Sequence, residues 1–395
     1  MEPTQIAEGV YDVGVTDWNV RDFHGYSTDL GTTYNAYLIV DEKIALIDTV
    51  REGFAGQLLE KIGRIVDPKS IDYVISNHTE MDHSGGLDRV MHRIGENKPI
   101  YCSKMGHKNL PKHFSPSWNY HPVASGETLS LGNRKLTFLE TRMIHWPDSM
   151  FSYLNENQIL FSSDGFGQHY SGPEKFDDQI DDAAVMYHAK KYFANILLLY
   201  SSHIQKLLEK VLDLGLEFKM ICPDHGVIWR KDPHKILDAY VRWCRQEPHK
   251  KAVVVYDTMW HSTEKMAEAI VSGIGKEGVS ARPLHLRKWH RSEVMTEVFD
   301  ARAVVVGSPT LNNQLFPSLA DFLTYMKGLK PLNKIGAAFG SYGWSGEAVK
   351  LINQELESMK FEMIDHGLRI QYVPDKEALE ACYEYGRKIG KAVNG

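Results

Sequence analysis

Short apolar runs separated by polar loops dominate the first half of the chain, and such runs predict β-strands. The runs at 34–40 (YNAYLIV) and 44–48 (IALID) are expected to form paired buried strands, and 71–76 (IDYVIS) a third. Further strands are predicted at 99–102, 135–140 and 158–161. Helical periodicity predicts helices near 183–200, at 204–214 and from Pro233 to Arg245, where Asp232 offers a cap before proline at the first helical position.

The second half alternates between apolar strands and amphipathic helices. Runs at 252–256 (AVVVY), 303–307 (AVVVG) and 335–339 (IGAAF) are continuously apolar, as expected of strands covered on both faces. Between and after them, apolar residues recur at helical spacing: Met266, Ile270 and Ile274, and then Val349, Ile352, Leu356 and Met359. This alternation predicts a doubly wound parallel sheet. The polar stretch 246–251 (QEPHKK) separates the two patterns, so we predict domains at 1–249 and 250–395.

Length, charge and cysteine usage narrow the class of protein. A chain of 395 residues is expected to fold as two domains. Its net charge of -6 argues against a nucleic-acid partner, and no apolar run is long enough to span a membrane. None of the four cysteines (Cys102, Cys222, Cys244 and Cys382) is in a CxxC arrangement, which excludes a zinc ribbon or a rubredoxin-like module. Scattered thiols without a signal peptide predict a cytoplasmic protein.

One short run carries most of the candidate chemistry. His78-Thr79-Glu80-Met81-Asp82-His83-Ser84 follows the predicted strand 71–76 and places four potential metal ligands within six positions. Side chains packed this closely do not all reach one ion, so the run predicts two adjacent metals. Three later residues complete the set, each at a strand-to-loop junction: His145, Asp164 and His225. Any one of them has an ordinary structural explanation, so the prediction depends on the ordered set.

The order HxExDH, then His, Asp and His resembles the flavodiiron proteins of the metallo-β-lactamase-like fold, and the resemblance covers essentially the whole chain. Hydrolytic relatives of this pattern have HxHxDH, whereas this chain has Glu80 at the third position. The resemblance implies an αββα sandwich (1–249) with two irons, joined to a flavodoxin-like domain (250–395) with FMN. By the family pattern, His78, Glu80 and His145 would hold one iron, Asp82, His83 and His225 the other, and Asp164 would bridge them with a hydroxide or water. In some members the residue matching His83 is turned away from the metal.

The donor types agree with iron. Imidazole and carboxylate ligands with an open position suit non-haem iron that binds a diatomic gas. Three carboxylates and one hydroxide would balance the charge of two ferrous ions, so a reduced site is accessible in a cleft of low dielectric. Zinc has no redox states and would not use an attached electron donor.

Three loops after strands of the second half predict a flavin site, because parallel sheets bind ligands at the carboxyl ends of their strands. Hydroxyls at a helix start suit a phosphate, the aromatic rings suit a flat ring system, and the lack of GxGxxG favours FMN over FAD or NAD. The first loop also lacks the glycine of the familiar flavodoxin loop. The candidate residues are Thr258, Met259, Trp260, Ser262 and Thr263, then Ser308, Pro309, Thr310, Asn312 and Asn313, and finally Ser341, Tyr342, Gly343, Trp344, Ser345 and Gly346.

The resemblance also implies an activity and partners. Family members reduce O₂ to water or NO to N₂O, and they pair head to tail, so a homodimer or a dimer of dimers is expected. Electrons are expected from rubredoxin or a similar donor, since the sequence shows neither a CxxC iron centre nor a reductase extension. His24, Tyr26, Trp146 and Tyr192 are the candidates for the gas pocket and for proton delivery, with structural packing as the alternative for each.

Two other functions remain open from the sequence. One is a zinc hydrolase of the lactamase superfamily, against which Glu80 and the second domain count. The other is an electron-shuttle flavoprotein with a metal-free first domain, against which the complete ligand set counts. The preference between O₂ and NO stays open, because both substrates need the same ligands.

Overall fold

The computed structural model describes residues 2–213 and 215–395, which form two compact units. The first unit comprises residues up to His24, Thr28–Phe193 and Tyr200–Cys244. The second comprises Arg245–Gly395 together with two short segments, Gly25–Ser27 and Ala194–Leu199.

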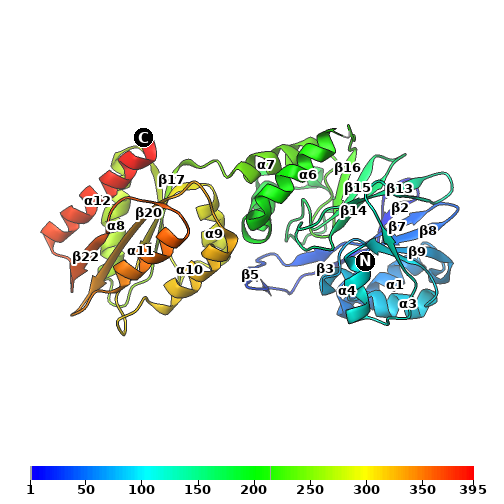
Figure 1. Cartoon of the computed structure of the whole chain (residues 1–395), viewed down its shortest axis with the longest axis horizontal. Coiled ribbons are helices and arrows are strands. Elements are labelled where there is room, and N and C mark those ends of the chain that lie inside the picture. Colours follow the sequence, from blue (N-terminus) through cyan, green and yellow to red (C-terminus); the bar gives the residue numbers. More distant parts are fainter. Residues whose placement is uncertain (1, 214) are drawn as a thin grey trace. The chain divides into compact units, whose positions relative to one another are not determined.

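Two sheets form the centre of the first unit (Figure 1). The larger has the order β1 (Thr4–Ala7), β2 (Val10–Asp12), β7 (Tyr37–Val40), β8 (Ile44–Ile47), β9 (Ile71–Ser76), β10 (Ile100–Ser103) and β11 (Tyr120–Val123). The smaller has the order β12 (Thr128–Ser130), β13 (Lys135–Glu140), β14 (Met150–Leu154), β15 (Ile159–Ser163) and β16 (Met220–Pro223). Strands β8 to β11 run parallel, as do β15 and β16, so their carboxyl ends open on one edge of each sheet. Shorter strands are β3 (Val15–Asp17), β4 (Asp22–Phe23), β5 (Tyr26–Ser27) and β6 (Thr32–Tyr34).

Helices cover the outer faces of both sheets. Side chains such as Ile47, Phe138 and Phe161 fill the space between the sheets. A second core lies under α1 (Ala55–Gly63), α3 (Leu87–Ile94) and α4 (Gly106–His113). On the other side are α5 (Asp182–Tyr192), α6 (Ser201–Asp213) and α7 (Pro233–Arg245), where the Tyr240 ring of α7 lies 4.6 Å from that of Phe166. The unit is therefore the αββα sandwich that was predicted.

The hydrophobic pattern located most elements but not all of their bounds. Strands 71–76 and 135–140 and helix Pro233–Arg245 are confirmed as predicted. The single strand predicted at 34–40 is wrong, because the chain there forms β6 and β7 with a break at Asn35. The backbone N–H of Asn35 donates instead to the carbonyl oxygen of Asp224 (2.7 Å), which takes Asn35 out of the strand ladder. Its side-chain amide donates to the carbonyl oxygens of Pro223 (2.8 Å) and Gly226 (2.9 Å). The helix predicted to reach 200 ends at Tyr192 and continues as π and 3-10 turns, and Leu214 lies outside the described residues.

The second unit is a parallel sheet with helices on both faces (Figure 1). Its strand order is β18 (Ser280–His285), β17 (His249–Tyr256), β19 (Ala301–Gly307), β20 (Ile335–Tyr342) and β21 (Glu362–Met363), and β22 (Leu368–Gln371) also pairs with β20. Helices α8 (Ser262–Lys276) and α12 (Lys376–Asn394) pack on one face through Ile270, Ile274 and Ile389. Helices α9 (Arg291–Phe299), α10 (Pro317–Leu329) and α11 (Ala348–Ser358) cover the other. The doubly wound sheet is thus confirmed.

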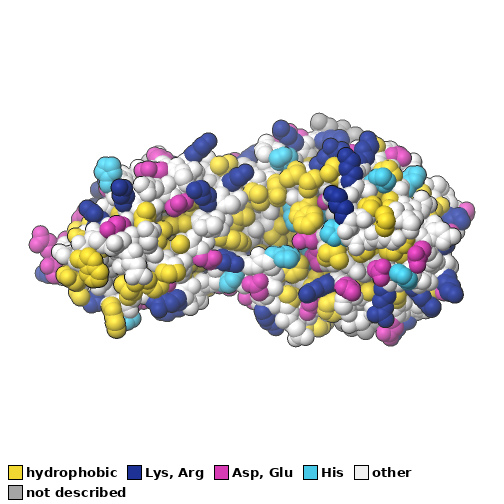
Figure 2. Space-filling model, turned by 60° about the horizontal axis from the view of Figure 1, so that its bottom comes forward, with side chains coloured by type: hydrophobic (Ala, Val, Ile, Leu, Met, Phe, Trp, Pro, Cys, Tyr) yellow, Lys and Arg dark blue, Asp and Glu magenta, His cyan; other side chains and the backbone are white. Residues whose placement is uncertain are grey.

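The surface carries charges of both signs. In Figure 2, basic and acidic side chains are interspersed over much of the face shown, with apolar side chains gathered between them. Within residues 2–213 and 215–395, no helix combines the length and the apolar composition that a membrane crossing requires.

Candidate metal centre and flavin site

The seven predicted ligands gather at the carboxyl ends of the strands in the first unit. His78 and Glu80 follow β9, Asp82 and His83 lie on the short helix α2 (Met81–Ser84), and the other three follow β13, β15 and β16. They form two groups. In the first group (His78, Glu80, His145 and Asp164) and the second (Asp82, His83 and His225), one ligand atom of each residue lies within 4.8 Å of those of the others.

Asp164 lies between the two groups. Its Oδ2 is 3.1 Å from His145 Nε2 and 3.5 Å from His78 Nε2, on the side of the first group. Its Oδ1 is 3.2 Å from His83 Nε2 and 3.5 Å from His225 Nε2, on the side of the second. One carboxylate therefore turns a different oxygen to each group, which is the arrangement of a bridging ligand.

The far nitrogens of three histidines face oxygen atoms of the protein, and two of them form hydrogen bonds. His78 Nδ1 lies 3.1 Å from Asp148 Oδ2, and His225 Nδ1 lies 2.6 Å from the carbonyl oxygen of Thr33. A carbonyl accepts only an N–H, so His225 carries its proton on Nδ1 and presents a free Nε2 to the site. His83 Nδ1 lies 3.3 Å from Asp224 Oδ2 without a hydrogen bond, and His83 Nε2 lies on the side of Asp82 and Asp164.

The polar atoms at the centre are buried and under-satisfied. His83 is 1% exposed, and its Nε2 has no hydrogen-bond partner although carboxylate oxygens lie 3.2 and 3.3 Å away. Asp82 Oδ1 and Asp164 Oδ2 are also buried without a hydrogen bond. Buried polar groups of this kind cost free energy unless something else pairs with them. Atoms that converge without hydrogen-bond angles are the ones expected to surround cations.

The electrostatics also favour positive charge at this point. Burial alone would lower the pKa of His78, but its hydrogen bonds to Asp148 and Glu80 outweigh burial and raise that pKa to about 10. Burial would raise the pKa of Asp164, yet the neighbouring His83 and His145 hold it well below its usual range. The three carboxylates of the site (Glu80, Asp82 and Asp164) therefore need positive charge nearby. Two metal cations bound by neutral imidazoles would provide that charge. The residues present fit a double metal site.

A cavity of about 510 Å³ opens beside the first group. Of the predicted pocket residues, His24 and Trp146 line it together with Glu80 and Asp82. His24 is 74% exposed at its side chain, and its Nε2 lies 3.4 Å from Glu80 Oε1. Phe23 and Met81 also line this cavity, as do Arg51 and His113, which the sequence did not single out.

Tyr192 and Tyr26 occupy other positions. Tyr192 is 1% exposed, and its hydroxyl donates to Asp164 Oδ1 at 2.8 Å. Burial and the Asp164 charge raise the pKa of Tyr192 well above its ordinary value, so the phenol keeps its proton. Tyr26 lies buried on β5 and is not among the residues that line the cavity.

Sequence reasoning missed the residues that hold the ligands. Asp148 stands three positions after His145, and Asp224 stands immediately before His225. One general rule could have found them. A histidine that binds a metal usually donates its second N–H to a carboxylate or a carbonyl, so acidic residues close to the ligand motifs are candidates for this role. Thr33 accepts the His225 hydrogen bond through its backbone carbonyl oxygen, which every residue type has, so the sequence could not indicate this contact.

Asp148→Ala is expected to weaken metal binding by about 10- to 100-fold, the usual cost of losing such a partner. Asp148 Oδ2 accepts from both His78 and the backbone N–H of Thr79 (2.7 Å), so alanine frees the ring to rotate. Asp148→Asn keeps an oxygen at this position and is expected to fall between wild type and alanine. Competition titrations with Co²⁺ and a chelator measure the order, and equal affinities for all three proteins would contradict it.

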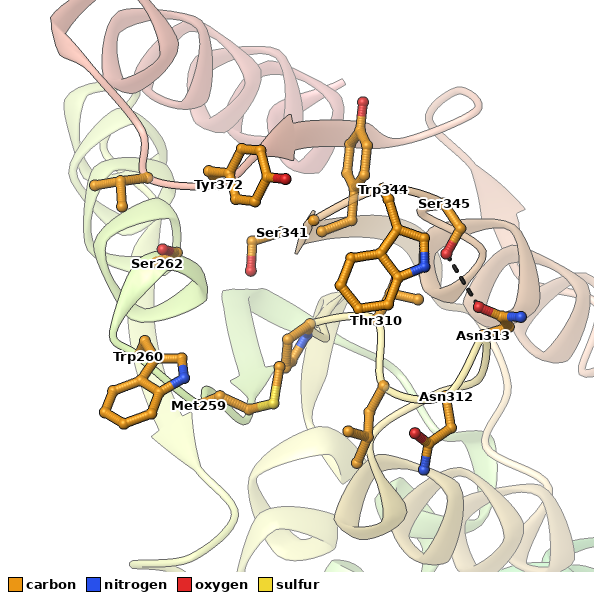
Figure 3. A pocket seen from close by; sticks show the side chains of 15 residues that line it. Met259, Trp260, Ser262, Thr310, Asn312, Asn313, Ser341, Trp344, Ser345 and Tyr372 are labelled. Carbon is orange, nitrogen blue, oxygen red and sulfur yellow. Dashed lines mark hydrogen bonds between the residues drawn. The ribbon is translucent and has the colours of Figure 1, made fainter.

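The second unit holds a cavity of about 490 Å³ at the carboxyl ends of β17, β19 and β20 (Figure 3). Trp260 and Trp344 stand on either side of it and are each 86% exposed, and Ser341 lies between them (Figure 3). Twelve predicted residues line it: Met259, Trp260, Ser262, Pro309, Thr310, Asn312, Asn313, Ser341, Tyr342, Gly343, Trp344 and Ser345. Exposed rings of this size facing a cavity fit a flat aromatic ligand.

The amino end of α8 borders the same cavity. Ser262 begins this 15-residue helix, and His261 before it has a left-handed backbone (φ 64°) with no side chain capping the first turn. The first backbone N–H groups of a helix have no partner within it and favour anions. A phosphate near Ser262 would meet these N–H groups and the serine hydroxyl, so the residues present fit a flavin mononucleotide.

Four other predicted flavin residues do not line the cavity. Thr263 and Ser308 are buried: the Thr263 hydroxyl pairs with Ser341 at 2.8 Å, and the Ser308 hydroxyl donates to the Pro309 carbonyl. Thr258 is 3% exposed, and Gly346 has φ 84° beside the Tyr342 ring. Leu311, Tyr372 and Val373 line the cavity and were not predicted. The last two follow β22, which the hydrophobic pattern did not reveal.

Comparison with known proteins agrees with both halves. The family model described as ODP family beta lactamase matches residues 32–226, and the flavodoxin model matches 254–386. A nitric oxide reductase of Moorella thermoacetica is 46% identical over 99% of this chain and 99% of its own. The solved rubredoxin oxygen:oxidoreductase of Desulfovibrio gigas is 42% identical with a TM-score of 0.97, over 100% of this chain and 99% of that one. The flavodiiron protein of Giardia intestinalis is 37% identical with a TM-score of 0.96, over 100% and 97%.

Fold and site together define a class of oxidoreductase in which a lactamase-like domain with a double metal site is joined to a flavodoxin domain. The identities extend over the full length of both domains, and not over one motif alone. The chain belongs to the flavodiiron protein family.

Proposed function

We propose that this protein reduces O₂ to water, NO to N₂O, or both, with two irons and one FMN. The observation that carries the proposal is the position of Asp164, whose two oxygens face two separate groups of imidazoles and carboxylates. The relatives named nitric oxide reductase and rubredoxin oxygen:oxidoreductase support the same chemistry. Four electrons and four protons convert O₂ into two waters, whereas two electrons and two protons convert two NO into N₂O and water.

In this proposal His78, Glu80 and His145 hold one iron, and Asp82, His83 and His225 hold the other. Bound iron supplies the gas-binding and redox chemistry, and bound FMN supplies a store of two electrons. Asp148, Asp224 and Thr33 keep three imidazoles turned inward, and Tyr192 donates to the bridging carboxylate. The inward Nε2 of His83 supports its place among the ligands.

FMN is proposed to occupy the cavity between Trp260 and Trp344, with its phosphate at the start of α8. Residues 250–395 then form the FMN-binding domain and residues 1–249 the diiron domain. Because these two sites belong to different units, we propose a head-to-tail homodimer in which each flavin serves the partner's metal site. The exposed tryptophans beside the cavity support an interface there. Sedimentation analysis of the holoenzyme tests the dimer.

The electron donor is proposed to be rubredoxin or a similar small carrier, as the name of the Desulfovibrio gigas relative indicates for that protein. We place the enzyme in the cytoplasm. All four cysteines are free and buried, which suits a reducing compartment.

Metal and flavin analysis of the purified protein tests the proposal first. Two irons and one FMN per chain are expected, followed by consumption of O₂ and NO after anaerobic reduction by rubredoxin. A protein with zinc and no iron would be the hydrolase alternative. A flavoprotein without metal that still reduced the gases after Glu80→Ala would be the shuttle alternative.

His24→Asn is expected to lower the turnover of O₂ and NO by roughly a hundredfold, which is the low end of the effect of losing a proton-transfer group. His24 lies in the cavity within 3.4 Å of Glu80, so asparagine removes its titratable ring. Tyr26→Phe serves as the comparison, because Tyr26 lies outside that cavity. Steady-state rates at matched iron content measure both variants. Tyr26→Phe is expected to stay near the wild-type rates, and unchanged O₂ and NO rates in His24→Asn would show that the pocket role of His24 is wrong.

A further inference from the structure

The segment around α4 is unusually basic for this chain. Residues 97–126 contain no aspartate and no glutamate, although the chain as a whole has a net charge of -6. The same segment contains Lys98, Lys104, Lys108 and Lys112. A long stretch with one sign of charge, opposite to that of the chain, marks a surface where the local field differs from the average.

Three of these lysines form a row. Lys104 precedes α4, and Lys108 and Lys112 lie on it, each four positions after the last, so they project from one side of the helix. All three are exposed, while Gly106 and Leu110 form the buried side. In the described part of the chain none of the three lysines forms an ion pair. We call Lys104, Lys108 and Lys112, with the exposed His107 and His113, the α4 basic face.

The α4 basic face is tied to the metal centre. The N–H of Gly106 donates to Ser103 Oγ at 3.0 Å, and Ser103 Oγ donates to the backbone oxygen of Asp148 at 2.6 Å. Asp148 in turn holds the ligand His78. At the other end of the helix, His113 lines the cavity that also contains Glu80. The end of the α4 basic face at His113 therefore lies at the rim of the cavity beside the metal ligands.

A surface helix that serves only solubility is the ordinary alternative. Helix α6 shows that pattern, since Lys206 and Lys210 alternate with Glu209, and its charges balance locally. Helix α4 has no acid to balance its lysines, so their mutual repulsion is relieved only by solvent, salt or a partner. Three lysines in a short row are too few for a nucleic-acid surface, which needs many phosphate contacts.

We propose that the α4 basic face is the docking surface for a small acidic electron-carrier protein. The inference rests on the proposed function, in which a carrier must approach the dimer where one chain's metal cavity meets the partner's flavin. Complementary charge raises the rate of encounter and orients the carrier, and both effects weaken as salt is added. Docking itself changes no bond.

The test compares two charge reversals of equal size in the FMN- and iron-loaded protein. Lys108→Glu with Lys112→Glu alters α4, and Lys206→Glu with Lys210→Glu alters α6, which lies on the opposite side of the first unit (Figure 1). Both pairs are exposed lysines four positions apart. Stopped-flow absorbance gives the second-order rate of FMN reduction by a prereduced rubredoxin of net negative charge, at about 20 mM and about 300 mM salt.

The α4 pair is expected to lower this rate roughly tenfold at low salt, with the difference closing at high salt. With the α6 pair, the rate of FMN reduction is expected to stay within about twofold of wild type, because these charges lie away from the proposed contact. Equal effects of both pairs, or an α4 effect independent of salt, would overturn the proposal. Lys108→Gln with Lys112→Gln gives a milder version if the reversal impairs folding. Photochemical reduction by a neutral deazaflavin bypasses docking, so failure of gas consumption there counts against the proposed function and not against the docking surface.

Discussion

Asp164→Asn is expected to remove metal from both groups and to lower O₂ and NO reduction by roughly a hundredfold or more, beyond the usual cost of losing a residue that only supports a ligand. Asp164 is the one carboxylate shared by the two groups, with Oδ2 facing His145 and Oδ1 facing His83. An asparagine presents one oxygen and an NH₂ group that does not ligate. The substitution also removes one negative charge from the site, so the binding of two cations there becomes less favourable.

Iron content per chain and flavin absorbance measure this outcome together. The flavin is expected to stay at wild-type level, because its site lies in a different unit. Asp177→Asn is a matched control: Asp177 is also buried in the first unit, but it accepts from the backbone N–H of Arg230 and Lys231, away from any ligand. An Asp164→Asn protein that keeps two tightly bound irons would show that Asp164 is not the bridge.

The variant Tyr192→Phe tests the hydrogen bond to the Asp164 carboxylate apart from the carboxylate itself. The variant loses the 2.8 Å hydrogen bond to Asp164 Oδ1 but keeps both carboxylate oxygens. Iron content near wild type, with a smaller loss of rate than for Asp164→Asn, is the expected order. The smaller effect is expected because Asp164 would bind the metals directly, whereas Tyr192 only orients the Asp164 carboxylate.

The sequence predicted the parts of this protein that depend on local patterns. The strand at 71–76 has the apolar residues Ile71, Tyr73, Val74 and Ile75 and ends two positions before His78, so the hydrophobic pattern places the ligand run directly after a rigid element. Likewise, the spacing of Met266, Ile270 and Ile274 predicts the buried face of α8, and α8 in turn places Ser262 at the flavin cavity. These features are set by side-chain type and period alone.

Features that depend on contacts between distant segments were not predictable in the same way. The break at Asn35 exists because its backbone N–H and its side-chain amide both donate to carbonyl oxygens of the distant segment 223–226. Thr263 and Ser308 were predicted to contact the flavin, yet their hydroxyls are directed to protein partners, Thr263 to Ser341 and Ser308 to the Pro309 carbonyl. The second unit also includes residues 25–27 and 194–199, which no composition shift marks.

Asp257→Ala is expected to destabilise the second unit by about 2–3 kcal/mol and to weaken FMN binding by at least roughly tenfold. Asp257 directly follows β17, at the start of the loop that leads to Ser262, and it is fully buried. Its carboxylate accepts from the N–H of Thr258 (2.6 Å), His285 Nε2 (3.1 Å), Arg287 Nε (2.8 Å) and Ser318 Oγ (2.6 Å). Alanine leaves these donors without their acceptor and frees the loop at the cavity.

The pH dependence gives this prediction a second readout. Burial would raise the pKa of Asp257, but hydrogen bonds from Ser318, Thr258, His285 and Arg287 outweigh it and lower the pKa below its ordinary value. A group with a lowered folded-state pKa stabilises fully above its unfolded pKa of about 4 and loses that effect as pH falls further. The difference in free energy of unfolding between wild type and Asp257→Ala is therefore expected to be constant near pH 7 and to shrink below about pH 4.

Urea unfolding and flavin titration at several pH values measure both effects. Asp321→Ala is the matched control, because Asp321 also pairs with an arginine (Arg291 at 2.6 Å) but is 54% exposed, and such pairs contribute about 0–1 kcal/mol. Equal destabilisation by the two variants would mean that Asp257 acts as an ordinary surface ion pair. If Asp257→Ala destabilises the second unit but binds FMN with full affinity, Asp257 stabilises the fold without shaping the flavin loop. The loop would then be held in place by the sheet alone.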